Sequence, residues 1–517
     1  MQRGGIAAAV GLGALLVYLT TAGGSLATED AVAMYEEGKA ILDRGAVSVP
    51  ASVSVPQWRG ENGAYYTPFG IGQPLYDVPF IAAGRVVTRV TGITLGTPDA
   101  IPKACVALGS AFAAAAAVAF TFLLGLELGG RTRGSVLAAF AAAFGTLLWP
   151  YSKFGFNAAV TAAALSGGVW GFAAAVRTGR TGLSIAGGLL LGFALLTRHE
   201  MALAASAACV WLWLEKGTAA IFRKKRGQPS EVASSHTVSA VPIFRKKSRL
   251  SPFSAACGIS AVVACAVAAG IYNAVRFGGP LSVGYTPAYS GAGFAGLTLS
   301  PAGAIFLYSP PAIAVVLLFR VRRQAAGQLL LAVCVILAVY YGLLDDWLGT
   351  RSYGPRYLVP ILPLAVAPLA LADFRSRLRR LAIVSIVAAG VLVQMPAVAV
   401  DFSRAGIHAG QPPADEREYS WKWAALPVTS REAARLVPDN IRFIARGQAP
   451  AIDRNAATLQ QKVDFSLDLW WLYLYYLGVL HRGQAVLIAM AFLGGGAAAW
   501  AIADRSARTE AVQYEDP

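Results

Sequence analysis

SLATEDAVAMYEEGKAILDRGAVSVPASVSVPQWRGENGAYYTPFGIGQPLYDVP, residues 25–79, stands apart from the rest of the chain. It begins with the acidic pair Glu29-Asp30, which lies where the first apolar run ends, and it continues with carboxylates, aromatic residues and prolines. Most of the remaining sequence has the apolar composition of buried or membrane helices. Because ionisable groups close to a membrane are often functional, this stretch is where we expect the chemistry of the protein.

The composition indicates an integral membrane protein. Of the 517 residues, 56% are hydrophobic and only 14% are charged, and the mean hydropathy is +0.54. Runs rich in Ala, Leu, Val and Gly recur along the chain, many of them near the ~20 residues that a bilayer-crossing helix needs. The length fits a single polytopic domain with loops. The sequence therefore predicts an all-α, multi-pass protein in contact with the lipid bilayer.

About twelve apolar runs are predicted to cross the membrane. They cover residues 5–23, 101–128, 135–150, 158–176, 182–196, 201–214, 252–274, 301–319, 328–344, 357–372, 381–400 and 485–503. The first run also has features of a cleavable signal peptide, but its length favours a retained helix.

The formal net charge of +16 lies mainly in short connectors between apolar runs. This distribution is expected for lysine and arginine retained in the cytoplasm, and it argues against a nucleic-acid partner. All five cysteines lie inside apolar runs, so the sequence offers neither a disulfide framework nor zinc-binding spacing.

The apolar segment 68–90 decides on which side of the membrane every later loop lies. If this segment does not cross, the basic connectors, including residues 216–249, collect on the cytoplasmic side, as positive charge generally does. We therefore predict an interfacial or re-entrant helix at 68–90, outside the cytoplasm. Its glycines and prolines fit, because interrupted backbone is tolerated where protein or water covers it.

These assignments divide the chain into parts. Residues 1–400 form a transmembrane catalytic domain, in which 24–100 is the first extracytoplasmic loop with interfacial helices and 215–252 is a basic cytoplasmic loop. Residues 401–483 form an extracytoplasmic segment, and 484–517 hold the last span and a cytoplasmic tail. We expect a cell inner or plasma membrane location, with the active site on the extracytoplasmic face.

Asp30, with Glu29 beside it, is the candidate catalytic residue. At this position a carboxylate can act as a general base, or as a metal ligand, over a substrate held in the membrane. The alternative is a solvated residue at the end of a helix.

Four cations on the predicted outer side are candidates for binding a phosphate: Lys153, Arg198, Arg351 and Arg356. Arginine presents a planar fork of donors that suits phosphate, and the Gly-Pro pair before Arg356 predicts a fixed turn. Each of these residues could instead be an interfacial side chain that extends its charge to water.

Several stretches resemble bacterial membrane glycosyltransferases of the GT-C fold, the class that contains the protein O-mannosyltransferases and the aminoarabinose transferase of lipid A. They are TEDAVAMYEEGKAILDRG, AYYTPFGIGQPLYDVPFIAAG, YNAVRFGGPLSVGY with LTLSPAGAIFLYSP, RSYGPRYLVPILP, LWPYSKFGFNAAV and LLTRHEMAL. These stretches are distributed over most of the chain up to about residue 363. Each stretch by itself is only loosely similar to the family, and the order in which the stretches follow one another is more specific.

The resemblance implies an inverting transfer of a hexosyl or pentosyl group from a polyprenyl-phosphate-linked sugar donor. The acceptor hydroxyl would belong to a glycan, a lipid or a protein. Asp30 matches the acidic position of the first loop and would be the general base, while Arg198, Arg356 and Lys153 would neutralise the departing phosphate. Tyr66, in the tyrosine-rich segment of that loop, is a further candidate for binding substrate.

One position departs from the pattern, because Asn157 stands where the resemblance implies an acidic residue. No cofactor is assigned, and a divalent metal stays open. Two other functions also remain: a transporter or flippase for lipid or sugar, and a non-catalytic protein of cell-envelope assembly. Polar groups at the outer ends of spans, rather than within them, count against the transporter.

Overall fold

The computed structural model describes residues 2–55, 58–97, 99–225, 249–349, 352–410, 412–413, 416–453, 455–456 and 458–513, without side chains for 216–225 and 511–513. Within these ranges the chain is helical, and extended pairing is limited to isolated β-bridges. The predicted all-α class is confirmed. Arg351 and residues 226–248 of the basic loop lie outside the described ranges.

Ten long helices form the bundle. They are α1 (Arg3–Thr21), α4 (Ala100–Glu127), α5 (Thr132–Phe144), α6 (Asn157–Thr178), α7 (Thr181–Thr197), α8 (Met201–Lys225), α9 (Pro252–Phe277), α13 (Ala325–Leu343), α15 (Arg377–Ala399) and α20 (Arg482–Gln513). Small residues bring some of these helices into close contact. A Cβ on Gly168 or Gly171 of α6 would collide with the backbone of α7. Such close approach at small residues is expected for membrane helices, which associate by van der Waals packing because lipid provides no hydrophobic driving force between them.

Two of the predicted spans are broken into short helical pieces. One consists of α11 (Ile305–Tyr308), η4 (Pro310–Leu317) and α12 (Leu318–Val321), and the other of η5 (Arg356–Ile361), α14 (Leu362–Val366) and η6 (Ala367–Leu371). Both carry several prolines, which lack the backbone N–H that a continuous α-helix needs, so tighter 3₁₀ turns replace it.

Among the described residues, seven helices are long and apolar enough to span a membrane. Five shorter apolar segments, which include both broken ones, coincide with the other predicted runs. The protein is therefore a multi-pass membrane protein, while the count of twelve spans stays a prediction.

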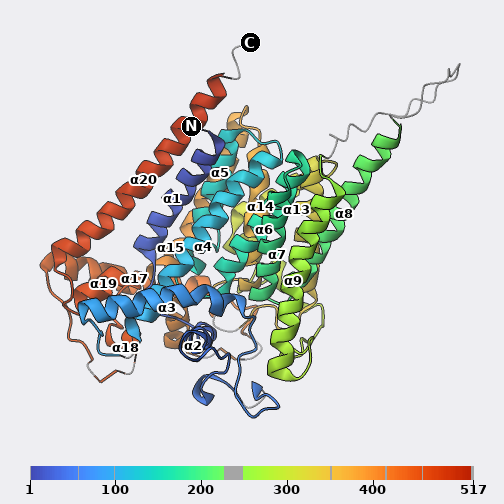
Figure 1. Ribbon diagram of the computed structural model, residues 1–517. Coiled ribbons are helices and arrows are strands. Elements are labelled where there is room, and N and C mark those ends of the chain that lie inside the picture. The colour runs from blue at the N-terminus through green and yellow to red at the C-terminus, as the bar shows by residue number, and fades with distance from the viewer. Residues whose placement is uncertain are drawn as a thin grey trace, which may run out of the picture.

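The remaining elements lie outside these spans. They are α2 (Glu29–Arg44), η1 (Ala51–Val53), α3 (Gly72–Thr91), η3 (Pro150–Ser152), α10 (Ala292–Leu299), α16 (Phe402–Ala409), α17 (Ala425–Arg446), α18 (Leu459–Lys462) and α19 (Trp470–Tyr476). Figure 1 shows α3 across the lower end of the bundle, with α2 seen end-on beneath it and α17, α18 and α19 at the same end.

The start of α1 and the C-terminal end of α20 lie at the opposite, upper end of the bundle (Figure 1). Arg3 forms an ion pair with Glu510 there, and Arg133 approaches Asp504. The helices α2, α3, α17, α18 and α19 are thus gathered at one end, and Arg3 and Arg133, paired with the last turns of α20, lie at the other. This arrangement supports an interfacial position for α3. If α3 instead crossed the membrane, every later loop would lie on the other side.

Candidate active site

The first turn of α2 fixes the position of Asp30. The Thr28 hydroxyl caps the helix by accepting a hydrogen bond from the Ala31 N–H, and carboxylates are favoured in this first turn by the helix dipole. Asp30 Oδ2 lies 3.2 Å from Arg356 Nη1. The Asp30 side chain is 30% exposed, so the pair borders solvent rather than being sealed in the core. Glu29, the first residue of α2, is exposed.

Arg356 begins η5, directly after the predicted Gly-Pro turn. Its guanidinium lies over the Phe156 ring at 5.2 Å and over the Tyr357 ring at 5.1 Å, contacts that orient a cation without occupying its donors. Arg356 Nε is buried and has no hydrogen-bond partner in the described part of the chain. A small cleft beside it is lined by Thr28, Tyr151, Phe154, Phe156, Ser352, Arg356 and Phe402. Arg356 therefore has a donor available to a ligand.

Arg198 reaches the same ring from another element. It ends α7, pairs with Glu200 at 2.7 Å, and lies 5.3 Å from the centre of the Tyr357 ring. Tyr341 stacks on Tyr357 with an interplanar angle of 7° and donates a hydrogen bond to Glu200. Nη1 of Arg198 is buried without a hydrogen-bond partner in the described chain. Tyr357 thus joins Arg198 and Arg356, each with an unused N–H group.

An exposed row of tyrosines continues outward from these rings. Tyr340 contacts Tyr341 at 5.2 Å and Tyr289 at 6.4 Å between ring centres. Glu200 and Arg198 both act electrostatically on the Tyr285 hydroxyl. Tyr285 and Tyr289 are each about half exposed, so this row of rings, here called the aromatic wall, extends from Tyr357 and Tyr341 to the surface.

Lys153 occupies a different cluster. Its ammonium lies 3.2 Å from Asp468 Oδ2 and donates to the Val398 carbonyl, and both side chains of the pair are fully buried. Burial also raises the pKa of Asp401, which Asp468 affects, to about 6. Among the described contacts, Lys153 has none to Asp30 or Arg356, so the structure does not bring this predicted phosphate ligand to the other two.

Tyr66 lies at the edge of a third cluster. It is almost completely buried, its hydroxyl accepts a hydrogen bond from Asn62, and its ring meets Phe277 edge-on. The structure places it in the folded first loop, against the end of α9, and the described contacts do not link it to Asp30 or Arg356.

The neighbouring Glu37 is a residue that the sequence did not single out. Its carboxylate accepts hydrogen bonds from Thr67 at 2.6 Å and from Tyr272, while Arg276 lies 3.6 Å from the Tyr272 ring. Burial raises the pKa of Glu37 to about 7, and the hydrogen bonds and the Arg276 charge oppose the shift. These contacts fasten α2, and with it Asp30, to the first loop and α9. The only signal in the sequence was Arg276 at the end of an apolar run.

Within the described residues, no group of three or more His, Cys, Asp and Glu side chains is arranged to hold a metal ion. Asn157 is the first residue of α6, and its buried Oδ1 has no hydrogen-bond partner in the described part.

A structural comparison covers almost the whole chain. ArnT from Cupriavidus metallidurans in the apo state is similar over 97% of this chain and 76% of that one, with a TM-score of 0.50 and 13% sequence identity. ArnT is a lipid A aminoarabinose transferase of the GT-C class. The chain has a GT-C fold. The GT-C resemblance read from the motifs is thereby confirmed at the level of the fold.

Two further structures are similar at lower scores. ArnT from the same organism bound to undecaprenyl phosphate has a TM-score of 0.49 and 14% identity, over 97% of this chain and 76% of that one. The Archaeoglobus fulgidus oligosaccharyltransferase with zinc and sulfate has a TM-score of 0.43 and 14% identity, over 81% and 57%. No protein-family model and no curated protein sequence matches this GT-C chain.

Proposed function

We propose that this protein is a membrane glycosyltransferase that moves a sugar from a polyprenyl-phosphate donor to an acceptor hydroxyl. One observation carries the proposal: a partly exposed carboxylate, Asp30, is paired with Arg356, and Arg198 shares the Tyr357 ring with that arginine. A base and two phosphate-binding groups are then adjacent, on a GT-C fold. This is the arrangement that displacement of a phosphate from an anomeric carbon requires.

In the proposed reaction, Asp30 accepts the proton of the acceptor hydroxyl as its oxygen attacks the anomeric carbon. The bond between that carbon and the phosphate oxygen breaks, and the polyprenyl phosphate leaves with the bonding electrons. Because the nucleophile and the leaving group lie on opposite faces of the sugar, the anomeric configuration inverts.

The two arginines stabilise the charge that develops on the leaving phosphate. Arg356 Nε and Arg198 Nη1 are buried donors with no hydrogen-bond partner in the described chain, and an unsatisfied buried donor is costly unless a ligand completes it. Charge-assisted hydrogen bonds to phosphate are about twice as strong as neutral ones. The aromatic wall that includes Tyr285 and Tyr289 offers ring faces on which the transferred sugar packs.

We place this reaction on the extracytoplasmic face of the inner or plasma membrane, on the basis of the charge distribution. The end of the bundle that carries Asp30 is opposite the end where Arg3 and Arg133 lie. The positive-inside tendency assigns the basic end to the cytoplasm.

Turnover of the donor by the reconstituted protein tests the proposal. Lipid-linked sugars extracted from the membranes of the source cells serve as donors, and release of free polyprenyl phosphate is followed by mass spectrometry. We expect Asp30→Asn and Arg356→Gln to abolish release while the protein remains folded and inserted. Asp43→Asn is the matched control, because Asp43 lies on the same helix and also pairs with an arginine, Arg85.

Release at the wild-type level by Asp30→Asn contradicts the proposed mechanism. Binding of polyprenyl phosphate without turnover by the wild-type protein favours a non-catalytic GT-C protein instead. Movement of the intact lipid-linked sugar between leaflets favours a flippase.

A further inference from the structure

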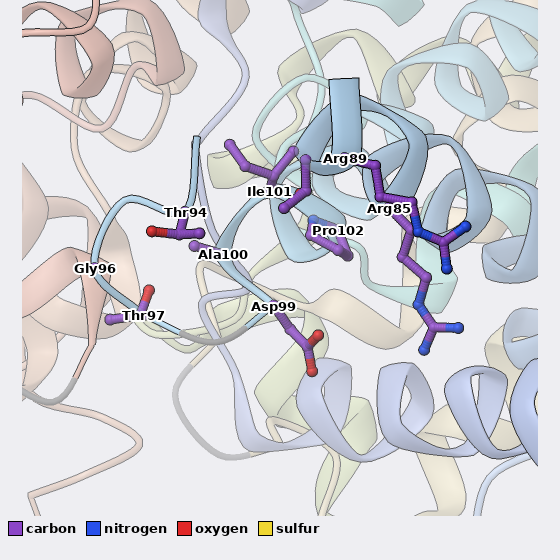
Figure 2. Close-up of a pocket in the computed structure, with 10 residues that line it drawn as sticks. Arg85, Arg89, Thr94, Gly96, Thr97, Asp99, Ala100, Ile101 and Pro102 are labelled. Atoms are coloured by element: carbon purple, nitrogen blue, oxygen red, sulfur yellow. The ribbon is translucent and has the colours of Figure 1, made fainter. Parts of the chain in front are cut away.

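A pocket of about 550 Å³ lies between α3 and the beginning of α4, away from the cleft beside Arg356. Figure 2 shows Arg85 and Arg89 extending from α3, with Thr94, Gly96 and Thr97 on the connecting loop and Asp99 between the two sides. Its volume falls in the range of about 300–1,000 Å³ that is typical of small-molecule sites. The residues that line it are different from those that line the Arg356 cleft.

Positive charge predominates around this pocket. Arg85 is paired with Asp43, with Nη2 and Oδ2 2.9 Å apart, and Lys39 is paired with Asp99. Arg89 is exposed and has no ion pair among the described residues, although it lines the pocket. The Lys462 ammonium on α18 donates to the Gly96 carbonyl at 2.8 Å on the loop wall. Lys39 also approaches Glu36 at 3.9 Å, so Asp43, Asp99 and Glu36 each have a cation beside them. Arg89 and Lys462 are the pocket cations that have no ion pair within the described residues.

The walls of the pocket are fixed by close contacts. Gly84 lies against Pro102, where a Cβ would collide with the proline backbone, so α3 and α4 meet directly. A Cβ on Gly96 would lie 2.7 Å from Lys462 Nζ. Leu95 and Asp99 both have positive φ, at 51° and 57°, a conformation that costs a non-glycine residue energy and persists only where its surroundings impose it. The pocket is therefore formed in advance of any ligand.

The exposed face of α3 indicates where the pocket lies relative to the membrane. Leu75, Val86 and Val90 are 43%, 56% and 80% exposed, and their spacing places them along one side of the helix. A helix with such a face lies in the plane of the bilayer surface with its apolar side toward the acyl chains. Arg85 and Arg89, four residues apart, then lie at the level of the lipid headgroups.

We propose that this pocket binds the phosphate of an anionic membrane lipid, with the unpaired Arg89 as its principal ligand and Arg85, which is shared with Asp43, as a second one. The pocket is preformed, positive and open at the depth where lipid phosphates lie, and a juxtamembrane cation attracts anionic lipid. The site is separate from the Asp30 cleft and does not depend on the proposed transfer. Its occupant holds α3, and through Asp43 and Asp99 the adjoining elements, at the membrane surface.

Native mass spectrometry of the full-length, delipidated protein tests this site, with phosphatidylglycerol as the anionic probe and phosphatidylcholine as the zwitterionic one. We expect the wild-type protein to retain phosphatidylglycerol preferentially. Arg89→Gln should weaken this binding roughly fivefold, the effect of one cation at a membrane surface, and Arg85→Gln/Arg89→Gln should weaken it further. Arg446→Gln is the matched control: Arg446 is an exposed arginine at the end of α17 and without an ion pair in the described chain.

Equal phosphatidylglycerol binding by wild type and Arg89→Gln, or equal binding of the two lipids, would overturn the proposal. If millimolar inorganic phosphate displaces phosphatidylglycerol at constant ionic strength, the pocket binds free phosphate rather than a lipid headgroup, and the lipid proposal is overturned. Arg89→Gln removes no described ion pair, so it remains decisive if the double variant, which breaks the contact with Asp43, fails to fold.

Discussion

Two ion pairs at the same end of the bundle have equal separations and opposite environments. Asp30 and Arg356 are 3.2 Å apart, with side chains 30% and 11% exposed, whereas Lys153 and Asp468 are also 3.2 Å apart, with side chains 0% exposed. The first pair keeps an unused donor, Arg356 Nε. In the second, Lys153 also donates to the Val398 carbonyl, and Asp468 accepts from the Tyr473 hydroxyl.

The difference distinguishes a pair that can bind a ligand from a pair that holds structural elements together, here called a clamp. The buried pair ties the turn at η3 to the end of α15 and to the start of α19, and Lys153 directs its ammonium to groups within the protein, the Val398 carbonyl and Asp468. The open pair borders solvent and keeps an unused donor, Arg356 Nε. A cation on the predicted outer side is therefore a good candidate for binding phosphate only when its own hydrogen bonds are incomplete.

The largest effect is expected for Asp30→Asn on activity. Loss of a general base typically costs about 10²–10⁴-fold in rate, and the amide cannot accept the acceptor proton. Protein stability should change less than it does on breaking a fully buried pair, because the Asp30 carboxylate borders solvent. Donor turnover and thermal unfolding of the same detergent-solubilised sample measure the two quantities. A large loss of stability in Asp30→Asn would make this pair a clamp as well.

Asp468→Asn should reverse that pattern. Removing one partner of a buried pair leaves Lys153 uncompensated in a low-dielectric site, which costs about 3–5 kcal/mol. We expect a lower free energy of unfolding, with turnover per folded molecule close to that of wild type. Asp464→Asn provides the control, since Asp464 contacts Arg404 nearby but is half exposed. If Asp468→Asn stays stable and loses turnover, Lys153 belongs to the site after all.

The helices could be predicted from the sequence because a bilayer imposes a direct length requirement on apolar runs. The twelve predicted runs coincide with helical segments, and the interfacial position of α3 stays a prediction from the charge distribution. The sequence did not predict the breaks in two of these runs, where prolines in η4 and η5 replace α-helix with 3₁₀ turns.

The site was only half accessible from the sequence. Asp30 and Arg356 were marked by position, each a charge beside the end of an apolar run. The partner of Lys153 was not, because Asp468 lies in a distant segment whose return to η3 no local pattern encodes. Glu37 has the same local sequence character as its neighbour Glu36, and only tertiary burial distinguishes the two.

Glu37 is a third carboxylate for this comparison, buried like Asp468 but without an ion pair among the described residues. Its folded-state pKa of about 7 exceeds the ordinary value of 4.5, so the folded protein holds this proton more tightly than the unfolded chain. Stability from this group is therefore complete below pH 4.5 and is lost as the pH rises through about 7.

Glu37→Gln should remove this pH dependence, which amounts to at most ~3 kcal/mol at 1.36 kcal/mol per pKa unit. Unfolding is measured across that pH range for both proteins, and the difference between them isolates Glu37 from His199, which faces the same Arg276. Glu36→Gln is the neighbouring control. Parallel pH profiles for wild type and Glu37→Gln would mean that the buried carboxyl does not change protonation in this range.

Arg356→Lys is the smallest and most specific change to the open pair. Lysine keeps the charge beside Asp30 but lacks the planar fork that leaves Nε free for a ligand. Hydrogen bonds to charged groups contribute about 1.5–3 kcal/mol, so binding of undecaprenyl phosphate should weaken roughly 10- to 100-fold while folding is preserved. Native mass spectrometry with undecaprenyl phosphate measures the loss of binding.

Arg404→Lys is the control, because the described contacts of Arg404 include two backbone carbonyls and Asp464. Since Arg404 donates to two backbone carbonyls, Arg404→Lys should affect unfolding more than lipid binding. Equal lipid affinities for wild type and Arg356→Lys would mean that charge alone, and not the unused donor, distinguishes the open pair from the closed one.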